Sequence, residues 1–205
     1  MNRYDEVKEK AAAIFPYKAM GEAALKQGDA RKALDYARTF EEKAKELLSE
    51  YNMLAAATVY LNASQFLASI FDRFENCERA VYHCHWTAML RVVNLLEEGI
   101  DHENCCQLLL ALTQSCLLSF NTLASKELSY DDNVGAIMYA YANIYFLLYH
   151  KLAQINPDNV LVKGSGRNFY QQLEQCGYSR DYSFPNSVKD SILVVGNISS
   201  KLNIL

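Results

Sequence analysis

Apolar residues recur along this chain at the spacing of an α-helix. Between residues 29 and 50 they stand three or four positions apart, at Ala30, Ala33, Leu34, Ala37, Phe40, Ala44, Leu47 and Leu48. That spacing places them on one face of a helix. The 205 residues include only three prolines and eight glycines, which favours long helices over many short strands. We therefore predict an all-α protein.

The same pattern predicts six long helices, over about residues 4–27, 29–50, 52–74, 77–98, 101–127 and 131–156. Pro16 either kinks the first helix or opens a second, shorter one. Gly28 suits the left-handed residue that ends a helix, and Asp29 suits an N-cap. Because the connections are short, neighbouring helices are expected to run antiparallel. Residues 1–156 then form an array of three hairpins, about 4–50, 52–98 and 101–156.

The pattern becomes less regular after Pro157. Residues 157–205 are predicted to form an irregular C-terminal tail with short helices that pack on the array. Lys163–Arg167 contains two glycines and indicates a flexible break. Ser187–Leu205 has enough apolar residues to dock, either as a closing helix or as a short extended segment. The tail is expected to close one end of the array or to fold back into its groove.

Charge and polarity exclude two classes of partner. The net charge is −4, and no segment has the dense basic patch that nucleic-acid binding needs. Three stretches without charged residues, 51–71, 104–125 and 133–150, approach the length of a membrane span. Amide side chains interrupt them, at Asn62, Gln65, Gln107, Gln114, Asn121 and Asn143. We therefore predict buried helices of a soluble protein rather than membrane spans.

The chain starts with charged, amphipathic residues, unlike a signal peptide. A cytoplasmic protein with reduced cysteines is the expectation. Two clusters of histidine and cysteine stand out, His83-Cys84-His85 and the set His102, Cys105 and Cys106. A zinc site needs four convergent ligands, and neither cluster has the usual ligand spacing. No motif for a nucleophile or a pair of converging carboxylates is present, so we expect neither an enzyme nor a bound metal or cofactor.

Tyrosines form a stripe on the last long predicted helix. Tyr141, Tyr145 and Tyr149 repeat every four residues, which places them on one face. Such a stripe is typical of a core seam whose hydroxyl groups reach the surface. It also suits an aromatic groove for a peptide or a partner helix, because tyrosines make rigid anchors. The sequence leaves both interpretations open.

The most informative segment is Tyr17–Ala44, two predicted helices around the turn Lys26-Gln27-Gly28-Asp29. Its matches to a known repeat pattern are Tyr17, Met20 and Gly21 in the first helix, Gly28-Asp29 in the turn and Ala33 in the second helix. The segment thereby resembles a tetratricopeptide repeat. It departs from that pattern at Ala24, Ala37, Phe40 and Lys45. The resemblance implies an array with elongated, irregular repeats, and an unrelated helical bundle would show a similar pattern.

The resemblance also implies a partner surface. Some tetratricopeptide domains hold the terminal carboxylate of a peptide with basic and Asn residues on the first helix of each repeat. Lys18 and Lys26 stand at positions that resemble those used, whereas Glu22 stands where Asn is expected. The three residues equally fit a solvated ladder of charges four positions apart.

These observations lead us to expect a protein–protein interaction domain that holds a peptide or partner helix in a helical groove. The candidate contact residues are Lys18, Glu22, Lys26, Tyr141, Tyr145 and Tyr149. One alternative is a helical bundle that binds a small ligand or metal in a closed cavity with His83 or His85 and Cys105. Another is a self-associating structural protein, a homo-oligomer joined through the low-charge faces of residues 104–150.

Overall fold

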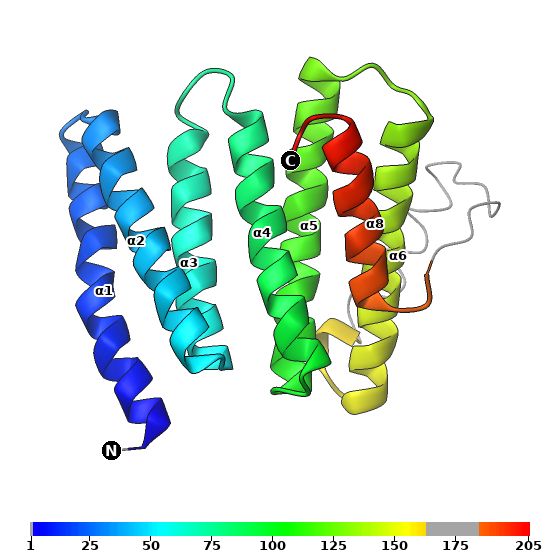
Figure 1. Cartoon of the computed structure of the whole chain (residues 1–205), viewed down its shortest axis with the longest axis horizontal. Coiled ribbons are helices and arrows are strands. Elements are labelled where there is room, and N and C mark those ends of the chain that lie inside the picture. The colour runs from blue at the N-terminus through cyan, green and yellow to red at the C-terminus, as the bar shows by residue number, and fades with distance from the viewer. Residues whose placement is uncertain (1, 163–184) are drawn as a thin grey trace. The chain divides into compact units, whose positions relative to one another are not determined.

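The computed structural model describes residues 2–162 and 185–205, and all regular structure within these ranges is helical. The helices are α1 (Arg3–Lys26), α2 (Ala30–Tyr51), α3 (Leu54–Phe71), α4 (Glu78–Glu97), α5 (His102–Glu127), α6 (Asp132–Ile155) and α8 (Val188–Lys201) (Figure 1). The all-α prediction is confirmed. The chain divides into two compact units, Met1–Arg91 and Val92–Leu205, and their boundary lies inside α4. α8 belongs to the second unit together with α5 and α6.

In the first unit, α1 and α2 form a hairpin, and both pack against α3. α1 runs through Pro16 without a break, so this proline does not divide the predicted first helix. The turn that follows has the expected chemistry. Gly28 adopts a φ of 78°, and the side chain of Asp29 accepts a hydrogen bond of 2.9 Å from the backbone N–H of Lys32.

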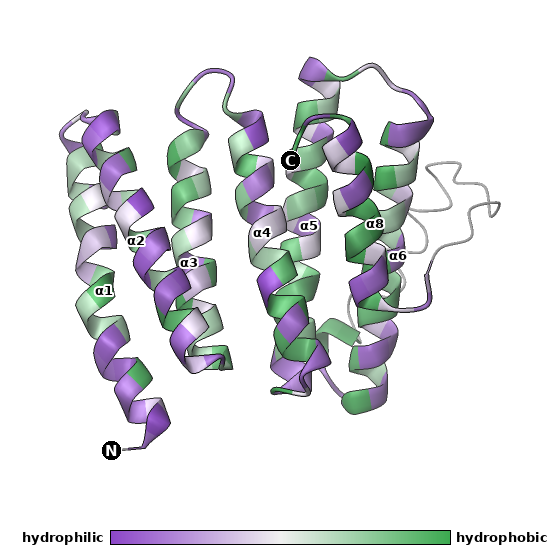
Figure 2. Cartoon of the chain, in the orientation of Figure 1, coloured by the Kyte–Doolittle hydropathy of each residue, from purple (hydrophilic) through white to green (hydrophobic). Residues whose placement is uncertain are grey.

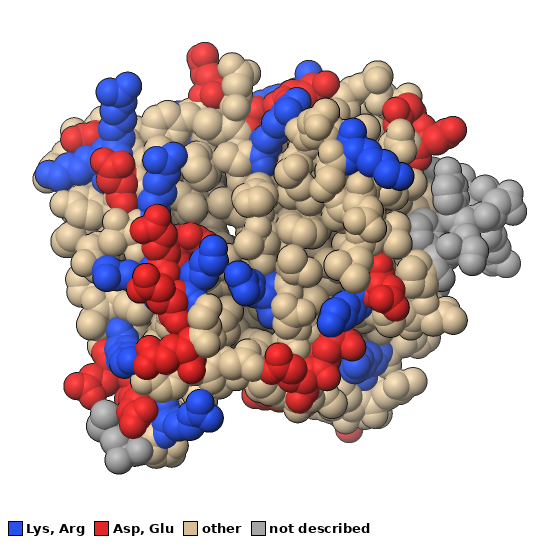
Figure 3. Space-filling model, viewed as in Figure 1, with Lys and Arg blue, Asp and Glu red and all other residues tan. Residues whose placement is uncertain are grey.

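α2 is strongly amphipathic, and the residues predicted to form its apolar face are buried, with Leu34 and Ala30 half-buried at its edge. Its opposite face carries charged side chains. Figure 2 shows hydrophilic residues along the visible side of α2, and Figure 3 shows Lys, Arg, Asp and Glu gathered over the same helix. α2 therefore buries one face against α1 and α3 and leaves the other in solvent.

α1 approaches α3 closely at Gly21. A Cβ atom at this position would lie 2.9 Å from two ring carbons of Phe66 in α3 and 3.5 Å from the backbone oxygen of Ala33 in α2. The Phe66 ring also meets Phe40 of α2, with ring centroids 6.4 Å apart. A residue without a side chain thus suits the place where α1, α2 and α3 come together.

In the second unit, α6 packs against α5 on one side and α8 on the other. Ser187 caps α8 by accepting a hydrogen bond from the backbone N–H of Asp190. Asn143 of α6 donates hydrogen bonds to the Ser191 hydroxyl at 2.9 Å and to the Pro185 carbonyl at 3.1 Å. The last segment of the chain is therefore a docked helix, the first of its two predicted alternatives.

Candidate functional site

The predicted contact residues of α1 lie along one edge of this helix. Its buried stripe is Val7, Ala11, Ile14, Gly21 and Ala24. On one side of that stripe, Lys10 and Tyr17 face α2, because Lys10 binds Glu50 and the Lys43 ammonium lies 5.7 Å from the Tyr17 ring centroid. Helix geometry places Lys18 and Glu22 on the other side. Lys18 is half-buried, whereas Glu22 and Lys26 are exposed.

α3 presents one narrow exposed stripe, and all of its side chains are polar and uncharged. The exposed residues of this helix are Thr58, Gln65 and Ser69, and Asn62, which lies between them in helical spacing, is half-buried. The Asn62 amide donates to the backbone oxygen of Thr58 at 2.9 Å, which leaves its carbonyl oxygen as an acceptor. The stripe combines hydrogen-bond donors and acceptors on an otherwise buried helix.

α1 and α3 are neighbours, because a Cβ atom at Gly21 would meet the Phe66 ring, and both helices also pack against α2. Lys18 and Glu22 of α1 and the exposed polar residues of α3 are solvent-accessible positions of these neighbouring helices. We call this surface, made of Lys18, Glu22, Asn62, Gln65 and Ser69, the α1/α3 face. The sequence showed Asn62 and Gln65 only as interruptions of an apolar stretch, yet their polar spacing with Thr58 and Ser69 was a detectable signal.

The tyrosine stripe lies in the core of the second unit. Tyr141 is fully buried and Tyr145 is 5% exposed, and the Tyr141 ring lies 6.3 Å from that of Phe120 in α5. Tyr149 is half-buried and donates its hydroxyl proton to the Val162 carbonyl oxygen at 2.8 Å. The face of α6 that bears the stripe is the face covered by its neighbouring helices. The interpretation as an open aromatic groove is therefore corrected to a core seam.

Three of the cysteines are poorly suited to nucleophilic chemistry. Burial, with a contribution from the Glu41 carboxylate, raises the pKa of Cys84 to about 12. Burial also raises the pKa values of Cys105 and Cys106 to about 11. Attack on an electrophile needs the thiolate, which these raised pKa values disfavour at neutral pH. Within the described residues, no three His, Cys, Asp or Glu side chains come together in a way that would hold a metal ion.

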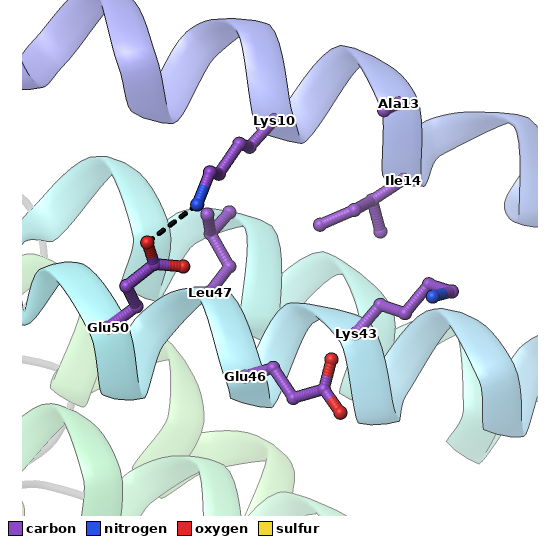
Figure 4. Close-up of a pocket in the computed structure, with 7 residues that line it drawn as sticks. All are labelled: Lys10, Ala13, Ile14, Lys43, Glu46, Leu47 and Glu50. Atoms are coloured by element: carbon purple, nitrogen blue, oxygen red, sulfur yellow. Dashed lines mark hydrogen bonds and ion pairs between the residues drawn. The ribbon is translucent and has the colours of Figure 1, made fainter.

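A shallow hollow of about 260 Å³ lies between α1 and α2 (Figure 4). Its lining residues are Lys10, Ala13, Ile14, Lys43, Glu46, Leu47 and Glu50. At one end Lys10 donates a hydrogen bond of 2.6 Å to Glu50, an ion pair whose side chains are about half exposed. The two lysines and two glutamates balance each other, so the hollow has no net charge to select an ionic ligand.

A second polar cluster ties α5 to the end of α6. One carboxylate oxygen of Glu103 accepts hydrogen bonds from the side-chain amides of Asn156 and Asn159, both at 2.8 Å. The hydrogen bond from Asn156 has the largest effect on the pKa of Glu103, and both bonds lower it. Through this oxygen, the cluster joins the start of α5 to the end of α6.

Two helices, α3 and α5, are long and apolar enough to cross a membrane. In α3, 61% of the relevant 18-residue window is buried, and in α5 the share is 44%. Core helices of soluble proteins have the same length and composition, so this finding is weak evidence for a span.

No protein-family model, curated protein or solved structure matches this chain. The surfaces described above are therefore the only basis for assigning a function.

Proposed function

We propose that this chain is a cytoplasmic protein–protein interaction module that binds an extended peptide segment on the α1/α3 face. The observation that carries the proposal is the exposed stripe of α3. A helix that is otherwise buried leaves only hydrogen-bonding, uncharged side chains in solvent. Amide side chains suit a peptide backbone, because each offers both a donor and an acceptor.

The arrangement of the first unit supports the same proposal. α1 and α3 are neighbours, and both pack against α2. The segment Tyr17–Ala44 resembles a tetratricopeptide repeat. In such arrays, the first helices of successive repeats line the binding surface. We assign α1 and α3 to that role and α2 to the outer layer.

The charges along α1 restrict the kind of peptide. Lys18 and Lys26 flank Glu22, so the edge carries both signs within two helical turns. A peptide with acidic and basic residues at matching intervals fits this edge better than a purely acidic segment. Glu22 in particular disfavours a terminal carboxylate held at this position.

The test compares two glutamine substitutions in an affinity capture from a native lysate. Gln65→Arg places a long charged side chain on the α1/α3 face, and Gln114→Arg makes the same change at an exposed position of α5. Arginine is a good helix former, so both variants should fold, which circular dichroism would verify. We expect a captured protein to be lost with Gln65→Arg and kept with Gln114→Arg.

A fragment of that protein would then be titrated as a synthetic peptide. Binding should weaken at least tenfold in Gln65→Arg, since the substitution removes hydrogen bonds and adds bulk at the contact. Equal capture and equal affinity in both variants would show that the α1/α3 face is not the binding surface.

A further inference from the structure

The exposed positions in the middle of α1 are unusual for a helix at the surface. Between residues 11 and 21, every exposed residue is apolar. The six residues are Ala12, Ala13, Phe15, Pro16, Ala19 and Met20. In α2, by contrast, the exposed positions are Arg31, Lys32, Asp35, Arg38, Glu42, Lys45, Glu46, Ser49 and Glu50, all of them polar.

This outer face of α1 continues to Ala23, one helical turn beyond Ala19. Phe15 remains 40% exposed and Met20 remains 38% exposed at its borders. The opposite side of α1 is already buried against α2 and α3. α1 is therefore apolar on two sides, and only one of them is covered by the described residues. A helix of this composition is typical of one that packs between two neighbours.

We propose that a second copy of this chain covers the outer face, through antiparallel pairing of the two α1 helices. Ala12, Pro16, Ala19 and Ala23 form a strip of short, apolar side chains along which a second helix can approach. Phe15 and Met20 flank the strip and would fill the space at its two borders. An isologous contact of this kind requires that the face complement itself.

The charges at the ends of the strip meet that requirement. Lys8 lies seven residues before Phe15 and Glu22 lies seven residues after it, and both are exposed on the same border of the face as Phe15. In an antiparallel pair centred on Phe15, Lys8 of each copy stands opposite Glu22 of the other. Lys26 likewise stands opposite the segment that contains Asp5. A parallel pair would instead bring like charges together at both ends.

Within one chain, Lys8 and Glu22 are fourteen residues apart on a straight helix, too far apart to interact with each other. A single helix pair is a small interface compared with standard ones of about 1,600 Å². We accordingly expect a reversible dimer with a Kd on the order of 10–100 μM.

Sedimentation velocity over a range of concentrations spanning that Kd would test the proposal. The wild type should change from monomer to dimer as concentration rises. Ala19→Arg should weaken the dimer at least tenfold, since it places a charged side chain in the centre of the strip. The matched control Ala111→Arg, at an exposed alanine of α5, should leave the dimer unchanged.

Charge reversal then identifies the second copy and the register. Lys8→Glu and Glu22→Lys should each weaken the dimer about threefold to tenfold at low salt, because each change occurs at two symmetric contacts. The double variant Lys8→Glu/Glu22→Lys should restore the wild-type Kd. Retained helical circular dichroism would confirm that every variant is folded.

Three results would overturn the proposal. They are a wild type that stays monomeric throughout, a dimer that Ala19→Arg leaves intact, and a double variant without restored affinity. A monomer whose outer face instead captures a different protein would assign that face to a heterologous partner. The proposal does not depend on peptide binding, although Glu22 belongs to both surfaces. Gln65→Arg changes the peptide surface alone and should leave the dimer intact, whereas Ala19→Arg changes the dimer surface alone, so these two variants separate the two ideas.

Discussion

α1 and α2 are the two helices of one hairpin, yet they expose different kinds of residue to solvent. α2 has a single apolar face, which is buried, and polar residues at every exposed position. α1 has apolar residues on both sides, of which α2 and α3 cover only one. The comparison shows that amphipathicity identifies the buried face of a helix only when the apolar residues occupy one side.

The largest expected difference concerns two phenylalanines whose ring centroids are 5.7 Å apart. Phe40 of α2 is fully buried and also meets Phe66, whereas Phe15 of α1 is 40% exposed. Phe40→Ala should lower the free energy of unfolding by about 3–5 kcal/mol, because it leaves a cavity. Phe15→Ala should cost about 1 kcal/mol or less. Urea unfolding would compare them, and equal losses would show that Phe15 belongs to the core.

A smaller effect should separate the two sides of α1. Gly21→Leu forces a side chain into the space held by the Phe66 ring and should destabilise the protein by about 1–3 kcal/mol. Ala23→Leu adds a side chain on the outer face of the same helix and should change stability by no more than about 0.5 kcal/mol. Thermal unfolding at low protein concentration measures both. A tolerated Gly21→Leu would mean that α1 and α3 do not pack closely.

The smallest effect concerns the exposed Lys10–Glu50 pair, which joins α1 to α2. The hydrogen bond with Lys10 lowers the pKa of Glu50 below its ordinary 4.5, and the bond with Glu50 raises the pKa of Lys10 above 10.5. A lowered carboxyl pKa stabilises the folded state above the ordinary value, and this contribution is lost as the pH falls through the folded value. A raised amine pKa stabilises it below 10.5, and this contribution is lost as the pH rises through the folded value.

The Lys10–Glu50 pair should therefore stabilise the folded state between the lowered pKa of Glu50 and the raised pKa of Lys10. Glu50→Gln is expected to lower the melting temperature slightly at pH 7 and not at all well below pH 4. Added salt should reduce the difference at pH 7, because exposed charges are screened. A difference between variant and wild type that persisted unchanged in acid would show that the carboxylate charge is not its cause.

The helices of the hairpin could be read closely from sequence because local signals agree there. α2 was expected over about 29–50 and spans Ala30–Tyr51, since its apolar period, Asp29 cap and Gly28 turn all indicate the same bounds. Other features had no local signal. Pro16 permits a kink, a break or a continuous helix, and only packing against α2 and α3 decides between them. The last segment, rich in β-branched residues, becomes helical because it docks on α6.

The candidate sites show the same limit. The spacing of Tyr141, Tyr145 and Tyr149 placed them on one face, but spacing does not show whether another helix packs on that face. The burial of Tyr141 against Phe120 of α5 decided that this face is core. The polar spacing on α3 was visible in the sequence, but its neighbour was not, because Gly21 and Phe66 are 45 positions apart and meet only in the folded protein.

The sequence by itself thus determined the fold class, the approximate helices and the turn chemistry, because helix periods, caps and glycines act over a few residues. Tertiary structure alone decided which apolar faces are buried and which remain at the surface. Burial depends on neighbours that are distant in the chain. An apolar face has the same sequence pattern whether or not another helix removes it from water. In α1, packing against α2 and α3 leaves one apolar face in solvent.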